Sequence, residues 1–137
     1  MKKAFKGVLA IILAVGMLAT LCSCSKYISS YRAFMLVRTN TSHSCATSFS
    51  SLNGQLVFKI KKTERGTEGD INYKIELEEG EIRLYYDIYG VKEELAHVKA
   101  GESVESSGGY VEGGYPVYII IEATGAVNGR VTVELDD

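Results

Sequence analysis

Apolar and polar residues alternate along two successive segments, 70–79 and 81–89. Because successive side chains of a β-strand point to opposite faces, each segment is predicted to be a strand with one buried face and one solvated face. Glu79-Gly80 between them is a turn signal, so the two strands are expected to form an antiparallel hairpin. The residues expected on the buried face are Ile71, Tyr73, Ile75, Leu77, Ile82, Leu84, Tyr86 and Ile88.

The same pattern predicts strands on both sides of this pair. Segment 55–62 alternates in the same way, and segment 115–124 is apolar on both faces, which is typical of a central strand. The glycine-containing stretch 125–129 marks a turn, after which segment 130–135 closes the chain as a last strand.

Four other segments are predicted less directly. Segment 91–100 has apolar residues at helical spacing but the length of a strand, and we expect a strand because its neighbours form a meander. Segment 31–39 fits a first strand or a short helix. The Ser- and Thr-rich segment 39–51 is expected to include an edge strand, and the glycine-rich segment 106–115 is expected to be a loop.

About seven or eight short strands, glycine-rich turns and a single proline predict an all-β fold. We expect an antiparallel β-sandwich of jelly-roll or immunoglobulin-like type, preceded by an N-terminal signal helix. The segment GGYPVYIIIEATGAVNGRVTVEL, residues 113–135, resembles the closing hairpin of small extracellular jelly-roll modules. These include bacterial pre-peptidase C-terminal domains and carbohydrate-binding domains. This resemblance carries no diagnostic site residue, and a fold by itself does not fix a function.

The start of the chain has the layout of a secretory signal. Lys2, Lys3 and Lys6 form a basic region, and residues 7–21 carry no charge. An uncharged segment of this length falls short of the ~20 residues that a membrane-spanning helix needs. It fits the apolar region of a signal peptide, so the sequence predicts export.

The residues Leu21, Cys22, Ser23 and Cys24 resemble the lipobox of bacterial lipoproteins. In that family a leucine lies three residues before an invariant cysteine, and a small residue directly precedes it. The resemblance implies that the Cys24 thiol receives a diacylglyceryl group and that the chain is cut between Ser23 and Cys24. Lipidation of Cys22 is the alternative, but it would place the bulky Leu21 at the scissile bond. The implied product is a lipid-anchored protein of the cell membrane, facing the extracytoplasmic side.

These boundaries divide the chain into a signal peptide (1–23), a lipidated tether (24–30) and one β-sandwich domain (31–137). Loss of the three leader lysines leaves 12 basic against 17 acidic residues and changes the formal charge from −2 to −5. An acidic balance argues against nucleic acid as a partner and against electrostatic attraction to anionic lipid. The lipid on Cys24 is therefore expected to provide the membrane attachment. Cys45 has no partner for an internal disulfide in the domain, so we expect a small, buried or half-buried residue, with a reactive or dimerising thiol as the alternative.

The sequence contains no recognised catalytic motif, and its two histidines lie far apart along the chain. No catalytic residue, metal site or cofactor is predicted, and the protein is not expected to be an enzyme. Two alternatives remain open. A pocket in which Glu78, Asp87 and His97 converge would favour a hydrolase, and the carboxylates around Glu79-Gly80 would suit calcium if they shared one turn.

Tyr85 and Tyr89 are predicted on the outer face of the second alternating strand, on either side of Asp87 and near Arg83. Exposed rings beside hydrogen-bonding groups suit stacking on a sugar or anchoring a protein partner. The sequence therefore predicts a non-catalytic binding or scaffolding module of unknown ligand. The alternative is a carbohydrate-binding module that recognises envelope glycans through these tyrosines.

Overall fold

The structure is a computed structural model that describes residues 27–136. The predicted lipobox residues Leu21, Cys22, Ser23 and Cys24 lie outside this part of the chain. The described residues form an antiparallel β-sandwich, which confirms the predicted fold class. Among residues 27–136 we find no helix of the length and hydrophobicity needed to cross a membrane. The strands are β1 (Ser30–Phe34), β2 (Val37–Asn40), β3 (Ser44–Lys61), β4 (Glu68–Asp87), β5 (Glu93–Lys99), β6 (Ser103–Glu112) and β7 (Pro116–Leu135).

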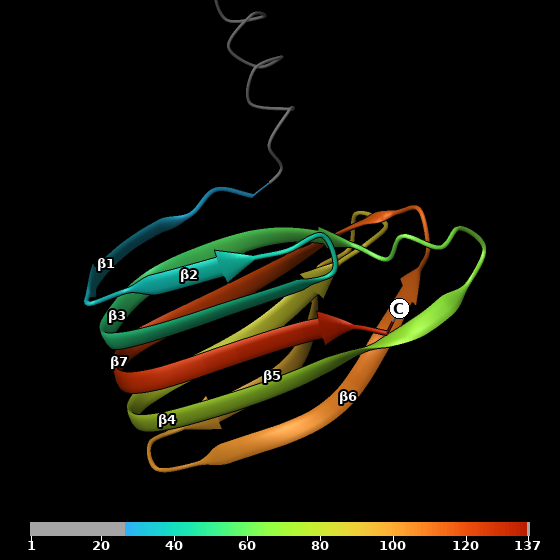
Figure 1. The fold of residues 1–137 in the computed structure, drawn as a ribbon. Coiled ribbons are helices and arrows are strands. Elements are labelled where there is room, and N and C mark those ends of the chain that lie inside the picture. Colours follow the sequence, from blue (N-terminus) through green and yellow to red (C-terminus); the bar gives the residue numbers. More distant parts are fainter. Residues whose placement is uncertain (1–26, 137) are drawn as a thin grey trace, which may run out of the picture.

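Three long strands form the centre of the molecule. β3, β7 and β4 contain 18, 20 and 20 residues and lie next to one another in that order. Each folds back on itself at the same end of the sandwich, so its two halves lie in two facing layers (Figure 1). The first layer is completed by β1 and β5, and the second layer is completed by β2 and β6. A single hydrogen-bonded sheet therefore builds both layers.

The folding back is produced by bulges at matching places in the three strands. The register of β3 against β7 shifts between Leu52 and Gly54, and that of β4 against β7 shifts between Glu79 and Glu81. An extra residue in one strand bends that strand and increases its twist. Gly80 has a positive φ of 87°, and a Cβ atom there would lie 2.3 Å from the backbone oxygen of Gly125. Only glycine permits both this conformation and this approach of β4 to β7.

The core fills the space between the two layers. Alternate residues of the long strands point into it, which is the pattern the sequence predicts for 55–62, 70–79 and 81–89. Each fully buried Leu, Ile or Val contributes about 1.5–3 kcal/mol relative to an exposed position. Cys45 is buried as expected, and burial raises the pKa of its thiol to about 12, so the thiol stays protonated. The largest fully buried side chains of this core are Leu52, Leu56, Ile60, Ile71, Ile75, Ile82, Leu84, Ile119, Ile121 and Leu135.

The predicted hairpins at Gly80 and at 125–129 are wrong. Segments 70–79 and 81–89 do not pair with each other, because both belong to β4 and pair with β7 as far as Asp87. Likewise, segments 115–124 and 130–135 belong to the single strand β7. A glycine between two alternating segments gives the same sequence signal for an in-plane hairpin and for a bend between layers. Whether the two segments on either side of the glycine pair with each other or with a third strand depends on which strands lie beside them.

Of the four segments that were predicted less directly, two contain strands as expected and two differ from the prediction. Segment 91–100 contains the strand β5, and segment 31–39 contains β1 and most of β2, separated by Met35 at a φ of 53°. Only the first two residues of segment 39–51 belong to an edge strand, since its second half lies between β2 and β7. The glycine-rich segment predicted to be a loop is largely strand β6, because pairing with β4 supplies the order that its composition does not.

Gly80→Ala tests the close approach at the bend. A Cβ atom would meet backbone rather than a movable side chain, so we expect a loss of roughly 3 kcal/mol or more in the free energy of unfolding, measured by urea denaturation. Gly101→Ala is the matched control, because Gly101 has a φ of 78° and open space around its Cβ position. It should cost only about 1 kcal/mol for the left-handed conformation. Equal losses in both variants would contradict the role of the close approach.

Candidate functional site

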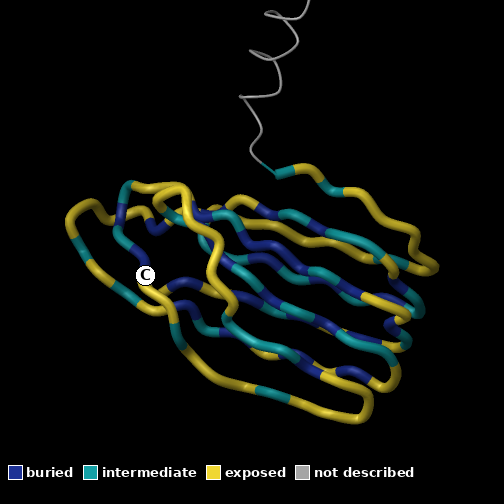
Figure 2. Tube along the Cα trace, turned by 180° about the vertical axis from the view of Figure 1, so that it is seen from behind, coloured by how far each residue is buried: buried dark blue, intermediate teal, exposed yellow. Residues whose placement is uncertain are grey.

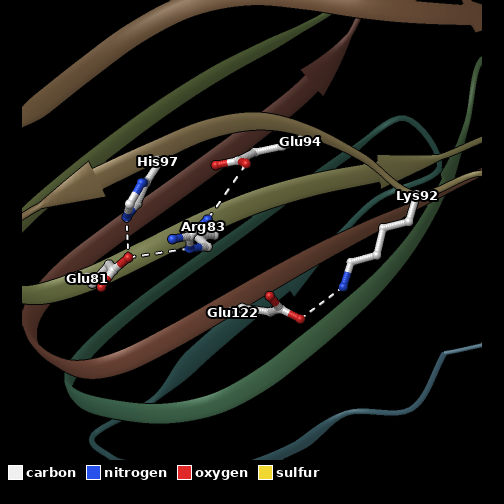
Figure 3. Close-up of polar contacts among 6 residues, drawn as sticks. All are labelled: Glu81, Arg83, Lys92, Glu94, His97 and Glu122. Carbon is white, nitrogen blue, oxygen red and sulfur yellow. Dashed lines mark hydrogen bonds and ion pairs between the residues drawn. The ribbon is translucent and has the colours of Figure 1, made fainter.

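Arg83 and Tyr85 lie on the outer face of the first layer, as predicted. Arg83 Nε lies 3.3 Å from Glu81 Oε1, and its Nη1 lies 3.8 Å from Glu94 Oε2. His97 also pairs with Glu81 through Nε2. Figure 3 shows these side chains of β4 and β5 pointing toward one another. The network ties β5 to β4, and Arg83 is committed to contacts within the protein.

The Tyr85 ring is partly covered by a neighbouring cation. The Lys92 ammonium lies 4.2 Å from the centre of the Tyr85 ring and donates a 2.9 Å hydrogen bond to Glu122 Oε1. Ile120 lies between Val57 and Tyr85 in the cross-strand register and is fully buried, although it points away from the core between the layers. Side chains of the protein therefore cover the outer face of the first layer around Ile120, and the Lys92 cation lies over the Tyr85 ring.

Asp87 was predicted on the outer face, but this prediction is wrong, since its side chain is buried. The Tyr27 hydroxyl donates a 2.5 Å hydrogen bond to Asp87 Oδ2, and the backbone N–H of Gly90 donates a 2.6 Å bond to Oδ1. Burial and this carboxylate raise the pKa of Tyr27 to about 12. Asp87 therefore fixes the N-terminal segment and the turn after β4.

Tyr89 lies beyond the end of β4 and belongs to a different surface from Tyr85. Its ring centre is 6.4 Å from that of Tyr110 in β6 and 5.5 Å from that of Tyr115, which precedes β7. All three rings are exposed, to 55%, 41% and 47% respectively. We call Tyr89, Tyr110 and Tyr115 the tyrosine cluster. It brings together residues that are up to 26 positions apart in the chain.

Two carboxylates hold the tyrosine cluster in place. The Tyr89 hydroxyl donates a 2.5 Å hydrogen bond to Glu112 Oε2, and the Tyr110 hydroxyl donates a 3.1 Å bond to Glu68 Oε1. Glu68 and Glu112 are themselves register partners of β4 and β6. The bond to Glu112 raises the pKa of Tyr89, and desolvation followed by the bond to Glu68 raises that of Tyr110. Both hydroxyls therefore remain neutral donors at physiological pH.

A shallow, open groove of about 650 Å³ lies on the second layer. Its walls come from β2, β3, β4, β6 and the end of β7, and its aromatic lining residue is Tyr73, whose ring is part of the core. The groove thus presents polar groups without an exposed ring. Its polar lining residues are Thr39, Ser44, Asn72, Lys74, Glu105, Ser106, Ser107, Thr132 and Glu134.

The structure does not bring the candidate hydrolase residues together. Glu78, near the bend, accepts a 2.7 Å hydrogen bond from Asn128, whereas Asp87 lies at the other end of β4 and bonds Tyr27. His97 pairs with Glu81 on the outer face of the first layer. Within residues 27–136, no group of three or more His, Cys, Asp or Glu side chains could hold a metal ion. Near Gly80, Glu76 pairs with Lys74, whereas Glu81 pairs with His97 and Arg83, so these carboxylates contact different partners rather than one shared site.

Of the tyrosine cluster, the sequence pattern indicated Tyr89 as a binding residue, but the predicted surface, shared with Tyr85, was wrong. Tyr110 and Tyr115 lie in a segment that was predicted to be a loop, so their approach to Tyr89 was not visible. Glu68 was part of a charged stretch without a distinctive pattern. The spacing of tyrosines and glycines in SSGGYVEGGY, residues 106–115, was the only local signal.

Comparison with known proteins gives similarity in fold only. No protein-family model matches the chain, and no curated protein matches its sequence. A family 61 carbohydrate-binding module in complex with β-1,4-galactotriose aligns with a TM-score of 0.45 and 12% identity, over 76% of this chain and 83% of its own. A variant of a family 29 carbohydrate-binding module, complexed with mannohexaose, gives 0.42 and 11% over 78% of each chain. Xylanase 10C from Cellvibrio japonicus gives 0.37 and 14%, over 79% of this chain and 27% of its own.

His97→Ala tests the network on the first layer. The bond to His97, followed by attraction to His97 and Arg83, holds the pKa of the Glu81 carboxyl below its ordinary value. A lowered folded-state pKa stabilises the fold above the ordinary glutamate pKa, and this contribution is lost as pH falls through the lowered value. In His97→Ala we expect the NMR titration midpoint of Glu81 to rise toward the ordinary value. Lys74→Ala, on the other layer, should leave it unchanged, and an unmoved midpoint in His97→Ala would contradict the pairing.

Proposed function

We propose that this chain is a bacterial lipoprotein whose non-catalytic β-sandwich is held at the extracytoplasmic side of the cell membrane by lipid on Cys24. We propose further that it binds envelope glycans through the tyrosine cluster. The anchor rests on the basic start, the short apolar segment 7–21 and the lipobox pattern that ends at Cys24. The glycan ligand rests on the arrangement of exposed rings and carboxylates at the end of the sandwich.

The position of the first described residues suits an anchor at Cys24. The hydroxyl of Tyr27, the carbonyl of Ile28 and the hydroxyl of Ser29 are all hydrogen-bonded to the sandwich. Part of the predicted tether therefore packs on the domain. Tyr27 lies three positions after Cys24, and an extended chain covers about 10 Å over three positions. A lipid on Cys24 would keep this side of the sandwich close to the bilayer.

The single observation that supports a glycan ligand is the tyrosine cluster with Glu68 and Glu112. The apolar faces of sugar rings pack on aromatic rings, and sugar hydroxyls donate hydrogen bonds to carboxylates. The cluster combines both kinds of group on one exposed surface. The hydroxyls of Tyr89 and Tyr110 are already bonded to Glu112 and Glu68, so these two rings lose little conformational freedom on binding.

Substitution of the cluster tests the glycan ligand. We expect binding to an array of bacterial envelope glycans that falls by a factor of about 10 or more in Tyr89→Ala and in Tyr115→Ala, because each removes a ring from the contact surface. Tyr31→Ala is the matched control, since Tyr31 has a similar exposure of 40% but lies on β1 at the opposite edge. Absence of binding to any envelope glycan, or equal binding by all the variants, would remove the proposal.

Incorporation of labelled palmitate tests the anchor. We expect the wild-type chain and Cys22→Ala to take up label in bacterial cells and Cys24→Ala to take up none. The lipobox pattern places Cys24 after a small residue and Cys22 after a leucine. Label retained in Cys24→Ala and lost in Cys22→Ala would move the lipid to Cys22. Absence of label in the wild-type chain would remove the lipoprotein assignment.

A further inference from the structure

Exposed apolar side chains are concentrated at one edge of the sandwich. Every residue of β1 and β2 is exposed, and Figure 2 shows the exposed colour running without interruption along β1. Among the described residues, five of the nine exposed large hydrophobic side chains lie within residues 28–37. Single exposed apolar residues are ordinary, but a group of this kind marks an interaction surface. We call residues 28–38 the tether edge; its exposed apolar residues are Ile28, Tyr31, Phe34, Met35 and Val37.

Met35, in the turn between β1 and β2, combines an unfavourable backbone conformation with an exposed apolar side chain. Met35 has a φ of 53°, a conformation that glycine or asparagine adopts more easily, and it is 70% exposed. Its neighbour Phe34 is 66% exposed. Folding in water does not account for a strained and exposed methionine beside an exposed phenylalanine, since a polar residue would suit this turn better. Contact with an apolar phase does account for them.

Charge is distributed unevenly between the two sides of the molecule. No acidic residue precedes Glu64, whereas six of the 12 basic residues that would remain after cleavage before Cys24 do so. β1, β2 and β3, which form the tether edge and its neighbouring strand, therefore carry basic charge only. The described acidic residues all follow β3, from Glu64 in the β3–β4 connection to Asp136 after β7, and β5 and β6 form the opposite edges of the two layers. The net charge conceals this separation, so the sequence argument against attraction to anionic lipid does not apply to the tether edge.

We infer that the tether edge docks on an anionic phospholipid surface. Phe34, Met35 and Val37 enter the interfacial region of the bilayer, and the exposed Arg32 contacts lipid headgroups. The inference rests on the proposed anchor, which keeps Tyr27 and the start of the tether edge within about 10 Å of the lipidated residue. Because the tyrosine cluster lies on the β4 and β6 side, docking turns it away from the membrane.

A tryptophan reporter tests this contact, since the chain has no tryptophan of its own. The lipidated mature protein carrying Phe34→Trp is reconstituted into vesicles of phosphatidylcholine and phosphatidylglycerol. We expect a blue-shifted emission that is quenched when the acyl chains carry bromine. The quenching should weaken when phosphatidylglycerol is replaced by phosphatidylcholine. Tyr110→Trp is the matched reporter on the opposite edge and should show neither the shift nor the quenching.

Met35→Asn in the Phe34→Trp background separates membrane contact from folding. Asparagine keeps the left-handed conformation but is polar, so thermal unfolding should be preserved while the quenching of the reporter decreases. Arg32→Gln in the same background should remove most of the dependence on phosphatidylglycerol. Unchanged quenching in both variants would overturn the proposed contacts.

The other outcomes also decide the question. If the protein floats with the vesicles and neither reporter is quenched, the anchor holds and the docking is wrong. Equal quenching of both reporters would contradict the orientation. If the protein carries no lipid and does not float, the anchor and the docking that depends on it both fail. Crosslinking of the tether edge to itself on vesicles without quenching would identify a second copy of the chain as the occupant instead.

Discussion

The aligned bend of β3, β7 and β4 is the constraint on which the rest of the structure depends. Each strand crosses from one layer to the other at the same end of the sandwich, so hydrogen bonding continues through both layers. The close approach at Gly80 and Gly125 allows the bend, and the buried residues of the six half-strands fill the space that it creates. A core built this way leaves the two edges of the sandwich and its open end to be formed by short strands and turns.

The tyrosine cluster and the charged side-chain network of the first layer both involve these short strands and turns. The tyrosine cluster forms where the end of β4, the end of β6 and the start of β7 meet, with carboxylates from β4 and β6 behind it. The charged network on the first layer has the opposite character, because Arg83, Glu81 and His97 pair with one another and Lys92 covers Tyr85. Exposed and preorganised rings suit ligand binding, whereas a self-paired network suits stability.

The proposed anchor and the proposed docking surface together define how the sandwich would be oriented on the membrane. The tether edge is apolar and basic, and the tyrosine cluster lies on the acidic side of the molecule. A lipid on Cys24 together with contact through Phe34 and Met35 would restrict rotation of the sandwich on the membrane. A glycan site on the far side would then face the envelope rather than the bilayer.

The sequence by itself determined the all-β class and the buried faces of the long strands, because alternation reports directly on which side of a strand faces the core. It did not determine strand pairing, since a glycine at residue 80 fits a hairpin and an interlayer bend equally well. It placed Asp87 at the surface because strand alternation does not reveal that Tyr27 folds over it. The tyrosine cluster was decided by tertiary structure alone, because its rings meet only when β6 pairs with the start of β4 and the chain turns at Asp87.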